Sequence, residues 1–553
     1  MKRKRTTQLA VRKMAAKPGW FRIFPWAWLC LAYLGIILFL YRYGRPYIDS
    51  DMASEMILAD LLNQEGGWLS ANWWYSTELR VFYHQPFYRL GLLLFPENWH
   101  EARMMGQAML LMLLLLSYIY AARGVKLKNW GVWGAAALAS PFGVWYLWYG
   151  PFGGAYLPHM ILVLLSFGAI QHLLHTHRMQ KIPHILILLA AGCGSGLNGV
   201  KGLMGFYLPM FVSAAAILAV DWHQNGGKCP VYPFRQVLYS GLALIAAAAG
   251  YLVNSVVLSR YYHFADYNGQ TWNHLSLQNL VEQWSNFLSL FGFPGDRFLN
   301  PKIPLFSICG ILGAMGVLTA AAVCIALVRL FLRWGRLKEE QRIIPALFAG
   351  VCLIQGMIFA WTGRPEEING SYWLTVMPLT FYVLQLEGET EDFRIPHGKQ
   401  VAALAFSCCV VATSISALLQ FFTAGYRINP QLETVCDELM NRRYTQGYAT
   451  FWNGNVMTEW SSGEIDMWVT WDFHTMEPYQ WLQKTSHTQP PEGEVFLLTT
   501  YQELNQMGLS WLLEHTEPAY EHLGWGIFPN EQQYVVFCYP SYEEMMTVIQ
   551  SGA

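Results

Sequence analysis

Three carboxylates lie close together just after the first apolar run of the chain. Asp49, Asp51 and Glu55 all fall within residues 47–70. If this segment is helical from about Asp51, then Asp51, Glu55 and Ala59 share one face, because residues four apart align along a helix. A carboxylate placed in this way can accept a proton from an attacking hydroxyl, which is general-base chemistry. The same acids could instead hold a divalent cation, Mg²⁺ or Mn²⁺, with Asp49 and Asp51 as the first candidate ligands.

A structural role for these acids stays open at the level of sequence. Ser50 or Asp51 can cap a helix, and acids in the first turn interact favourably with the positive end of the helix dipole. An amphipathic helix at the membrane interface would place its apolar side chains against the membrane surface. In this segment those side chains are Met56, Ile57, Leu61 and Leu62.

Two basic residues could bind a phosphate group. Lys201 lies in a glycine-rich stretch at the end of an apolar run, and Arg364 lies in the short loop 362–371. The planar guanidinium of arginine fits phosphate oxygens, although Arg364 could equally pair with Glu366 or Glu367. The glycine-rich stretch lacks the Gly-Lys-Ser/Thr ending of a nucleotide-binding loop, so we do not expect a nucleotide there.

Residues 72–90 interleave charged side chains with aromatic ones, and Glu78 and Arg80 are further candidates for binding substrate. Aromatic rings in this stretch could stack on sugar faces or hold a lipid head group. Aromatic residues also form anchoring belts at the membrane interface in many membrane proteins, and that alternative stays open.

The composition indicates what must position these residues. Hydrophobic residues make up 54% of the chain and charged residues only 13%, which excludes a water-soluble enzyme. The net charge of -1 gives no field that would attract nucleic acid. Apolar runs near membrane-spanning length predict about eleven transmembrane helices. They fall near residues 25–43, 104–122, 130–149, 156–173, 184–198, 203–220, 237–258, 304–330, 344–361, 372–386 and 401–422.

Basic residues predict the topology. The tail at residues 1–24 is rich in Lys and Arg, and further basic residues recur in every second loop, which places these segments in the cytoplasm. Loops 44–103 and 259–303 then lie outside. Short loops and the lack of a retention motif favour a multi-pass protein of a bacterial plasma membrane.

The chain is therefore expected to contain a transmembrane domain at residues 25–422 and an extracytoplasmic domain at residues 423–553. The second part is more polar and contains strand-like runs at 496–501 and 533–540, which predict a small α/β domain. Cys436 and Cys538 could form a disulfide or remain two thiols.

Residues 47–70 resemble the first outer loop of GT-C glycosyltransferases, such as protein O-mannosyltransferases and aminoarabinose transferases. The matching positions, in order and spacing, are Asp51, Ala59, Leu62, Gly66, Trp68 and Leu69. Many members of the class have an Asp-Glu pair, whereas Met52 follows Asp51 here. A second, weaker likeness lies at Tyr372, Trp373 and Pro378, where Ser371 stands in place of an expected arginine.

The resemblance implies a GT-C-like fold and an inverting glycosyltransferase that uses a sugar linked to polyprenyl phosphate. It implies Asp51 as the general base, with Asp49 or Glu55 as the alternative acid. The sugar, a hexose or a pentose, would pass to an envelope glycan, lipid or protein on the outer face. Two other functions stay open: a transporter or flippase of lipid-linked glycans, and an envelope assembly protein without catalysis. Transporters usually keep ionisable residues near the bilayer midplane.

Overall fold

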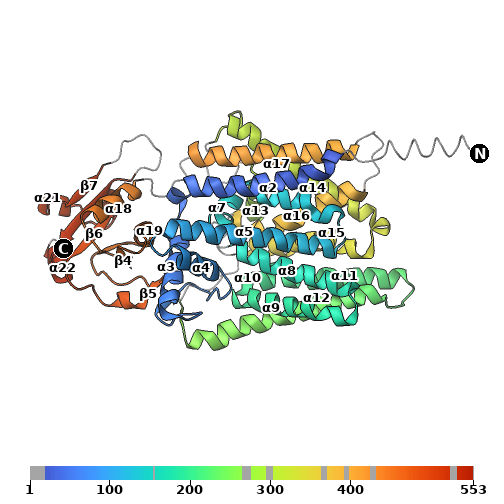
Figure 1. The fold of residues 1–553 in the computed structure, drawn as a ribbon, viewed down its shortest axis with the longest axis horizontal. Coiled ribbons are helices and arrows are strands. Elements are labelled where there is room, and N and C mark those ends of the chain that lie inside the picture. The colour runs from blue at the N-terminus through green and yellow to red at the C-terminus, as the bar shows by residue number, and fades with distance from the viewer. Residues whose placement is uncertain are drawn as a thin grey trace, which may run out of the picture.

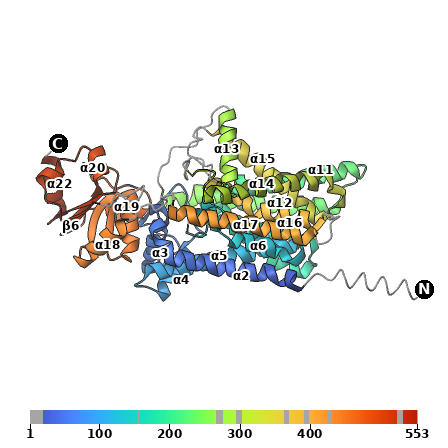
Figure 2. The same cartoon turned by 90° about the horizontal axis from the view of Figure 1, so that it is seen from above.

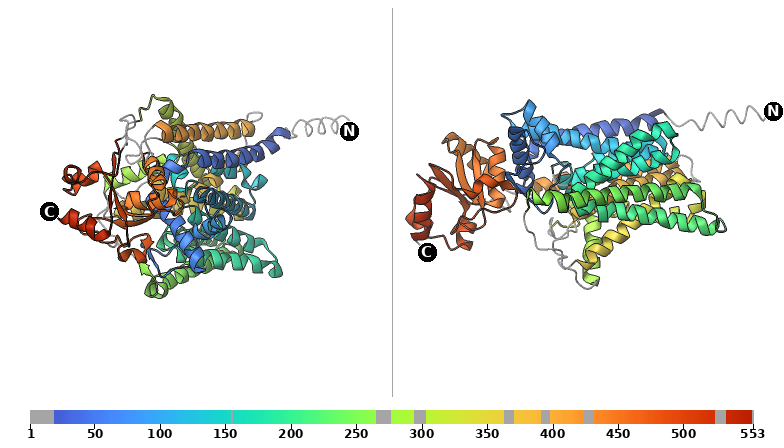
Figure 3. Two further views of the ribbon diagram at one scale, coloured as in Figure 1. Left: turned by 60° about the vertical axis from the view of Figure 1, so that its left-hand side comes forward. Right: turned by 90° about the horizontal axis from the view of Figure 1, so that it is seen from below.

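The computed structural model describes residues 19–153, 156–264, 276–293, 303–362, 370–390, 398–423, 431–523 and 532–551. Long, roughly parallel helices form one body, and a smaller domain with a β-sheet sits at one end of it (Figure 1). Figures 2 and 3 show the same division from other directions. The fold is a mostly helical membrane protein with a C-terminal α/β domain, as the sequence predicts.

Eight described helices are long and apolar enough to cross a membrane. They are Ile23–Tyr43, Trp99–Gly124, Tyr156–His175, Val200–Gln224, Val231–Arg260, Ile308–Leu332, Glu339–Trp361 and Gly398–Phe422. In the labels of Figure 1 they belong to α2 (Gly19–Tyr43), α5 (Trp99–Gly124), α8 (Tyr156–His175), α10–α11 (Val200–Gly202 and Leu208–Gln224), α12 (Val231–Leu252), α14 (Ile308–Leu332), α15 (Glu339–Trp361) and α17 (Gly398–Thr423).

The other three predicted runs are helical but shorter or interrupted. Run 130–149 forms α6 (Val132–Ala139) and α7 (Val144–Tyr149), run 184–198 lies in α9 (Lys181–Leu197), and run 372–386 is divided between a 3-10 turn (Gly370–Val376) and α16 (Met377–Thr390). Helix α9 packs closely on α12, because Gly196 lies directly against the backbone of Ala247. A helix outside these runs, α13 (Leu277–Ser289), contacts α15.

Several loops that the sequence places in the cytoplasm meet at the end of the helical body away from the C-terminal domain. Ion pairs join them there: Lys126–Glu340 (3.0 Å), Arg342–Asp221 (3.0 Å) and Arg333–Glu387 (3.4 Å). Loops predicted to share one side of the membrane therefore also share one end of the protein.

The C-terminal domain contains a five-stranded mixed sheet with the order β4-β3-β6-β8-β7. Its strands are β3 (Gln446–Thr450), β4 (Asp466–Thr470), β6 (Val495–Thr500), β7 (Tyr520–His522) and β8 (Tyr534–Tyr539). Its helices are α18 (Leu432–Asn441), α19 (Phe451–Trp460), α20 (Tyr501–Gln506), α21 (Leu512–His515) and α22 (Tyr542–Ser551). Cys436 and Cys538 are both free thiols, so the disulfide considered from the sequence is not formed.

A second, three-stranded sheet connects parts of the chain that are distant in sequence. The central strand β1 (Trp73–Tyr75) pairs with β2 (His263–Phe264) in parallel and with β5 (Gln483–Lys484) in antiparallel orientation. The first long loop, the second long loop and the C-terminal domain are thereby hydrogen-bonded to one another. Helices α3 (Ser50–Glu65) and α4 (Gln85–Leu94) lie in the same region, between the helical body and the C-terminal domain (Figure 1).

The prediction that α3 rests its apolar side chains on the membrane surface is wrong for most of that face. Met56, Ile57 and Leu62 are buried within the protein. They belong to a hydrophobic cluster that includes Phe451 and Leu482 of the C-terminal domain. The membrane surface is not needed to cover these side chains, because the C-terminal domain and α4 cover them instead.

Candidate active site

Helix α3 begins at Ser50, one residue before the predicted start, and its N-cap is Asp49. The Asp49 side chain accepts a hydrogen bond of 2.8 Å from the Met52 backbone N–H. The two capping candidates taken from the sequence were Ser50 and Asp51, so that assignment is corrected by one position. Burial and the neighbouring Asp51 charge raise the pKa of Asp49 to about 7. Asp49 therefore has a structural role that leaves Asp51 available for chemistry.

Asp51 stands in the first turn of α3, and its side chain opens into a cavity. Solvent reaches it through the cavity, but the surrounding protein limits its hydration, and this burial raises its pKa above the usual aspartate value. The Arg80 charge, a hydrogen bond from the Trp481 side chain and the Lys201 charge act in the opposite direction. Asp51 thus lies near two cations, Arg80 and Lys201, and accepts a hydrogen bond from the indole of Trp481.

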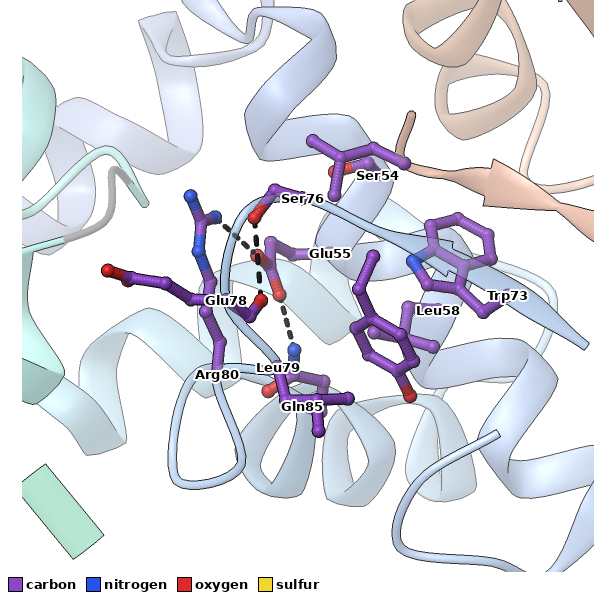
Figure 4. A pocket seen from close by; sticks show the side chains of 11 residues that line it. Ser54, Glu55, Leu58, Trp73, Ser76, Glu78, Leu79, Arg80 and Gln85 are labelled. Carbon is purple, nitrogen blue, oxygen red and sulfur yellow. Dashed lines mark hydrogen bonds and ion pairs between the residues drawn. The ribbon is translucent and has the colours of Figure 1, made fainter. Parts of the chain in front are cut away.

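Glu55, one helical turn further on, is buried and already engaged. Its carboxylate accepts hydrogen bonds from Arg80 Nη1 (3.1 Å) and from Gln85 Nε2 (2.6 Å). Figure 4 shows Glu55 between these two side chains. Burial raises the pKa of Glu55, and the Arg80 charge opposes that shift. Glu55 lines the cavity, but its carboxylate is already hydrogen-bonded, so it orients Arg80 and is not an unengaged base.

Arg80 is fixed by its backbone as well as by Glu55. Its φ angle of 45° lies in the left-handed region, which is uncommon for a residue other than glycine. Its guanidinium also lies 5.0 Å from the centre of the Tyr83 ring. Unusual backbone conformations persist where surrounding structure enforces them, and they are frequent at functional sites. The guanidinium is therefore held at the cavity wall.

The cavity has a volume of about 210 Å³ and brings together most of the residues selected from the sequence. Its lining residues are Asp49, Asp51, Met52, Glu55, Arg80, Tyr83, Tyr149, Gly153, Tyr156, Lys201, Ser371 and Tyr372. Lys201 Nζ lies 5.8 Å from the ring centre of Tyr156 and 5.6 Å from that of Tyr372. A negatively charged group entering this space would meet Arg80, Lys201 and the aromatic rings beside them.

Glu78 lies beside the cavity rather than in it. It lines a smaller adjoining pocket with Glu55 and Arg80 (Figure 4). Its carboxylate rests on Gly199, where φ is +97° and a Cβ atom would collide with the Glu78 side chain. Glycine at position 199 therefore allows Glu78 to approach the start of α10, near Lys201.

One residue predicted from the sequence lies outside the described part of the chain, and several residues of the site were not predicted from the sequence. Arg364 is not among the described residues. Tyr83 lies within the aromatic stretch 72–90, which gave a weak signal for it. Tyr149, which lines the cavity, and Trp481, which contacts Asp51 without lining it, gave no signal, because each is distant in sequence from Asp51 and resembles many other aromatic residues of this chain.

The described residues contain no group of three histidine, cysteine or acidic side chains arranged to hold a metal ion. Of the acids in the cavity, Asp49 caps α3 and Glu55 binds Arg80. Asp49 and Asp51 stay candidate ligands of a divalent cation, and we assign no chemical step to a metal.

A fully buried ion pair holds α3 and the C-terminal domain against the helical body. Arg103 of α5 donates to both carboxylate oxygens of Glu459 in α19, at 2.5 and 2.6 Å. The same guanidinium donates to the Tyr88 hydroxyl (2.9 Å) and to the Met52 backbone carbonyl (2.7 Å). Because Met52 follows Asp51, this one side chain couples the position of the candidate base to the docking of the C-terminal domain.

Comparison with known proteins finds solved structures with a similar fold, but no protein family or curated protein that matches in sequence. ArnT from Cupriavidus metallidurans, solved with undecaprenyl phosphate bound, aligns with 93% of this chain and 98% of its own length, at 11% identity and a TM-score of 0.51. An oligosaccharyltransferase from Archaeoglobus fulgidus, tethered to an acceptor peptide, aligns with 96% of this chain and 78% of its own, at 12% identity and a TM-score of 0.46.

The chain is therefore a multi-pass membrane protein whose fold is similar to that of ArnT. The similarity to ArnT extends over nearly the whole length of both chains. The resemblance inferred from residues 47–70 is confirmed at the level of the fold.

Proposed function

We propose that the protein is an inverting glycosyltransferase that moves a sugar from a polyprenyl-phosphate donor to an acceptor hydroxyl. The observation that supports this most directly is the cavity, where one available acid, Asp51, faces two cations, Arg80 and Lys201. A glycosyl transfer from a phosphate-linked donor needs a base for the acceptor proton and positive charge for the departing phosphate. Both are present within one space.

The reaction proposed for this site exchanges one bond for another. The acceptor oxygen attacks the anomeric carbon of the donor sugar, and the bond between that carbon and the phosphate oxygen breaks. Asp51 takes the proton of the acceptor hydroxyl, and the bonding electron pair leaves with the phosphate. Arg80 and Lys201 stabilise the additional negative charge on the polyprenyl phosphate product. Attack opposite the leaving group inverts the anomeric configuration.

The three acids then have separate roles in this proposal. Asp51 is the base, Glu55 holds Arg80 towards the phosphate, and Asp49 maintains the start of α3. Tyr156 and Tyr372 flank Lys201 and offer ring faces to the sugar or the lipid head group. Arg364 keeps its sequence-based role as a candidate phosphate contact.

Transport of a lipid-linked glycan is the main competing function, and it predicts a different experimental outcome. A transporter would bind the lipid-linked sugar and release it chemically unchanged. A transferase releases polyprenyl phosphate and forms a new glycoside. Incubating the purified protein with a labelled undecaprenyl-phosphate sugar and bacterial membranes, and then separating lipid, glycan and protein fractions, tests the proposal directly. Label that always returns in the intact donor would reject the transferase.

Lys201→Ala is expected to weaken binding of undecaprenyl phosphate about tenfold, because a cation next to the phosphate is lost. Lys201→Arg should retain most of the affinity, since the charge remains. Binding can be measured with the purified protein in detergent, using uncharged undecaprenol to measure the contribution of the lipid tail. Lys228→Ala removes an exposed lysine elsewhere and serves as the matched control. Equal affinities for undecaprenyl phosphate in wild type and Lys201→Ala would contradict the phosphate assignment.

The proposed orientation places the cavity and the C-terminal domain outside the cytoplasm. In a cysteine-free background, single cysteines at Lys128, Lys228 and Lys338 should react with an impermeant maleimide only after the cytoplasmic face is opened. Cysteines at Gln64 and Glu477 should react in intact cells. All five positions are exposed, so differences in reactivity report the side of the membrane. Reaction of positions 64 and 477 from opposite sides would reject the topology.

A further inference from the structure

One segment of the C-terminal domain reaches back to the start of α3. After β4, an isolated bridge joins Thr470 to Pro478, and the Tyr479 N–H donates to the Val469 carbonyl (2.8 Å). The chain then turns sharply, because the Trp481 N–H donates to the Tyr479 carbonyl only two residues earlier (2.6 Å). Strand β5 follows at once and pairs with β1. Trp481 thus lies at a tight turn between the two sheets.

The backbone at this turn adopts a conformation that its sequence does not favour. Leu482 has a φ angle of 51°, in the left-handed region where a side chain is unfavourable. Two partners hold it there: its N–H donates to the Trp74 carbonyl (2.8 Å), and its carbonyl accepts from Asn455 Nδ2 (3.1 Å). Its buried side chain packs in the cluster that contains Ile57 of α3. A turn held from three directions gives Trp481 little freedom.

The Trp481 side chain meets Asp51 at the end of this turn. Its indole N–H donates a hydrogen bond to the Asp51 carboxylate. The indole ring of Trp481 is almost parallel to the Tyr479 ring, with an angle of 7° between their planes. A base in an active site must be held in the right orientation, and a donor fixed by packing provides this.

We propose that Trp481 is a positioning residue for Asp51, supplied by the C-terminal domain, so that the catalytic site is complete only when this domain is docked. This inference rests on the proposed function, because it presupposes that Asp51 acts as the base. It adds a residue 430 positions away in sequence to the site. The C-terminal domain is accordingly part of the catalytic apparatus and not only a cover.

The chemical difference between Trp481 and the two cations explains why this donor matters. Arg80 and Lys201 also face Asp51, but the proposed function directs both towards the donor phosphate. An indole N–H carries no charge and is a weaker partner for that phosphate than either cation. Trp481 can therefore keep its hydrogen bond to Asp51 when a phosphate enters, while the cations change partners.

The test compares side chains at position 481 that keep the aromatic ring but differ in the N–H group. Trp481→Phe removes the donor, and β-(3-benzothienyl)alanine replaces the indole N–H by sulfur with almost no change of shape. Both are expected to lower kcat about 10- to 100-fold, while KM for the undecaprenyl-phosphate donor changes little. The carboxylate stretching band of Asp51, identified by its absence in Asp51→Asn, should shift in the infrared spectrum of each variant. Trp471→Phe changes an exposed tryptophan of the same segment (59% exposed) and should leave kcat and the band unchanged.

The possible results separate this inference from the proposed function. A benzothienylalanine variant with wild-type kcat and an unshifted carboxylate band would overturn the role of Trp481, even if Asp51 proves essential. If Asp51→Asn is fully active, the proposed function fails, and the positioning role fails with it. If Trp481→Phe does not fold, the benzothienylalanine variant still decides the question, because it keeps the shape of the indole.

Discussion

Asp51→Asn is expected to abolish measurable sugar transfer while leaving the protein folded and inserted in the membrane. The amide keeps the shape of the side chain but cannot accept the acceptor proton, and loss of a general base typically lowers the rate about 10²- to 10⁴-fold. Because burial raises the pKa of Asp51, wild-type transfer should fall as the pH decreases, beginning at a higher pH than an exposed aspartate would require. Initial rates of label transfer across a pH series measure both effects.

Variants of the two neighbouring acids are the matched controls. Asp49→Asn should retain most of the stability and activity, because asparagine caps a helix about as well as aspartate. Glu55→Gln should have an intermediate effect, since it weakens the hold on Arg80 but removes no base. A loss at Asp49 equal to that at Asp51 would indicate two coupled acids or a shared cation, and rates measured with added Mg²⁺ or Mn²⁺ and with a chelator would distinguish these. Full activity of well-expressed Asp51→Asn would remove the catalytic assignment.

Glu459→Ala is expected to lower the free energy of unfolding by about 3–5 kcal/mol, because the Arg103 charge would remain buried without its partner. The two side chains are 0% and 3% exposed, so water cannot replace the lost carboxylate without a rearrangement. Arg103→Ala should destabilise the protein to a similar extent and also free the Met52 carbonyl. Thermal unfolding in detergent gives the stability, and hydrogen exchange of α3 and α19 shows whether the two helices loosen together.

The control for this ion pair is one on the surface of the same domain. Glu438→Ala breaks the pair with Arg442, in which the two side chains are 33% and 40% exposed. Such a pair contributes about 0–1 kcal/mol, so unfolding should change little. Equal stabilities for Glu459→Ala and Glu438→Ala would show that the buried pair does not fasten the C-terminal domain. Unchanged hydrogen exchange in α3 would show that the domain does not stabilise the site.

The membrane-spanning architecture could be predicted from the sequence because it depends on local composition. Hydropathy over about twenty residues identifies a helix that can cross a bilayer, whatever the rest of the chain does. The position of α3 was also predictable to one residue. Its cap was not, because Asp49, Ser50 and Asp51 are all good capping residues, and only the path of the preceding chain decides among them.

The surroundings of α3 were not predictable for a different reason. An apolar side chain such as Met56 indicates that something must cover it, but not whether lipid or protein does so. In the structure, Met56 packs in one hydrophobic cluster with Phe451 and Leu482, some four hundred residues later in the chain. Likewise, Arg80 and Lys201 stood out through their charge, whereas Trp481 is one of 24 tryptophans and became distinctive only through its contact with Asp51.

The strand pairing that joins β1 to β5 has a consequence for the order of assembly during biosynthesis. Residues 73–75 emerge from the ribosome early, yet their antiparallel partner at 483–484 is made after every membrane helix. The hydrogen bond from Ser50 to the Phe451 carbonyl spans 401 positions in the same way. Contacts between such distant residues form slowly, because a long loop must close first. We therefore expect the site to form last, and a chain that ends before residue 481 to lack sugar-transfer activity.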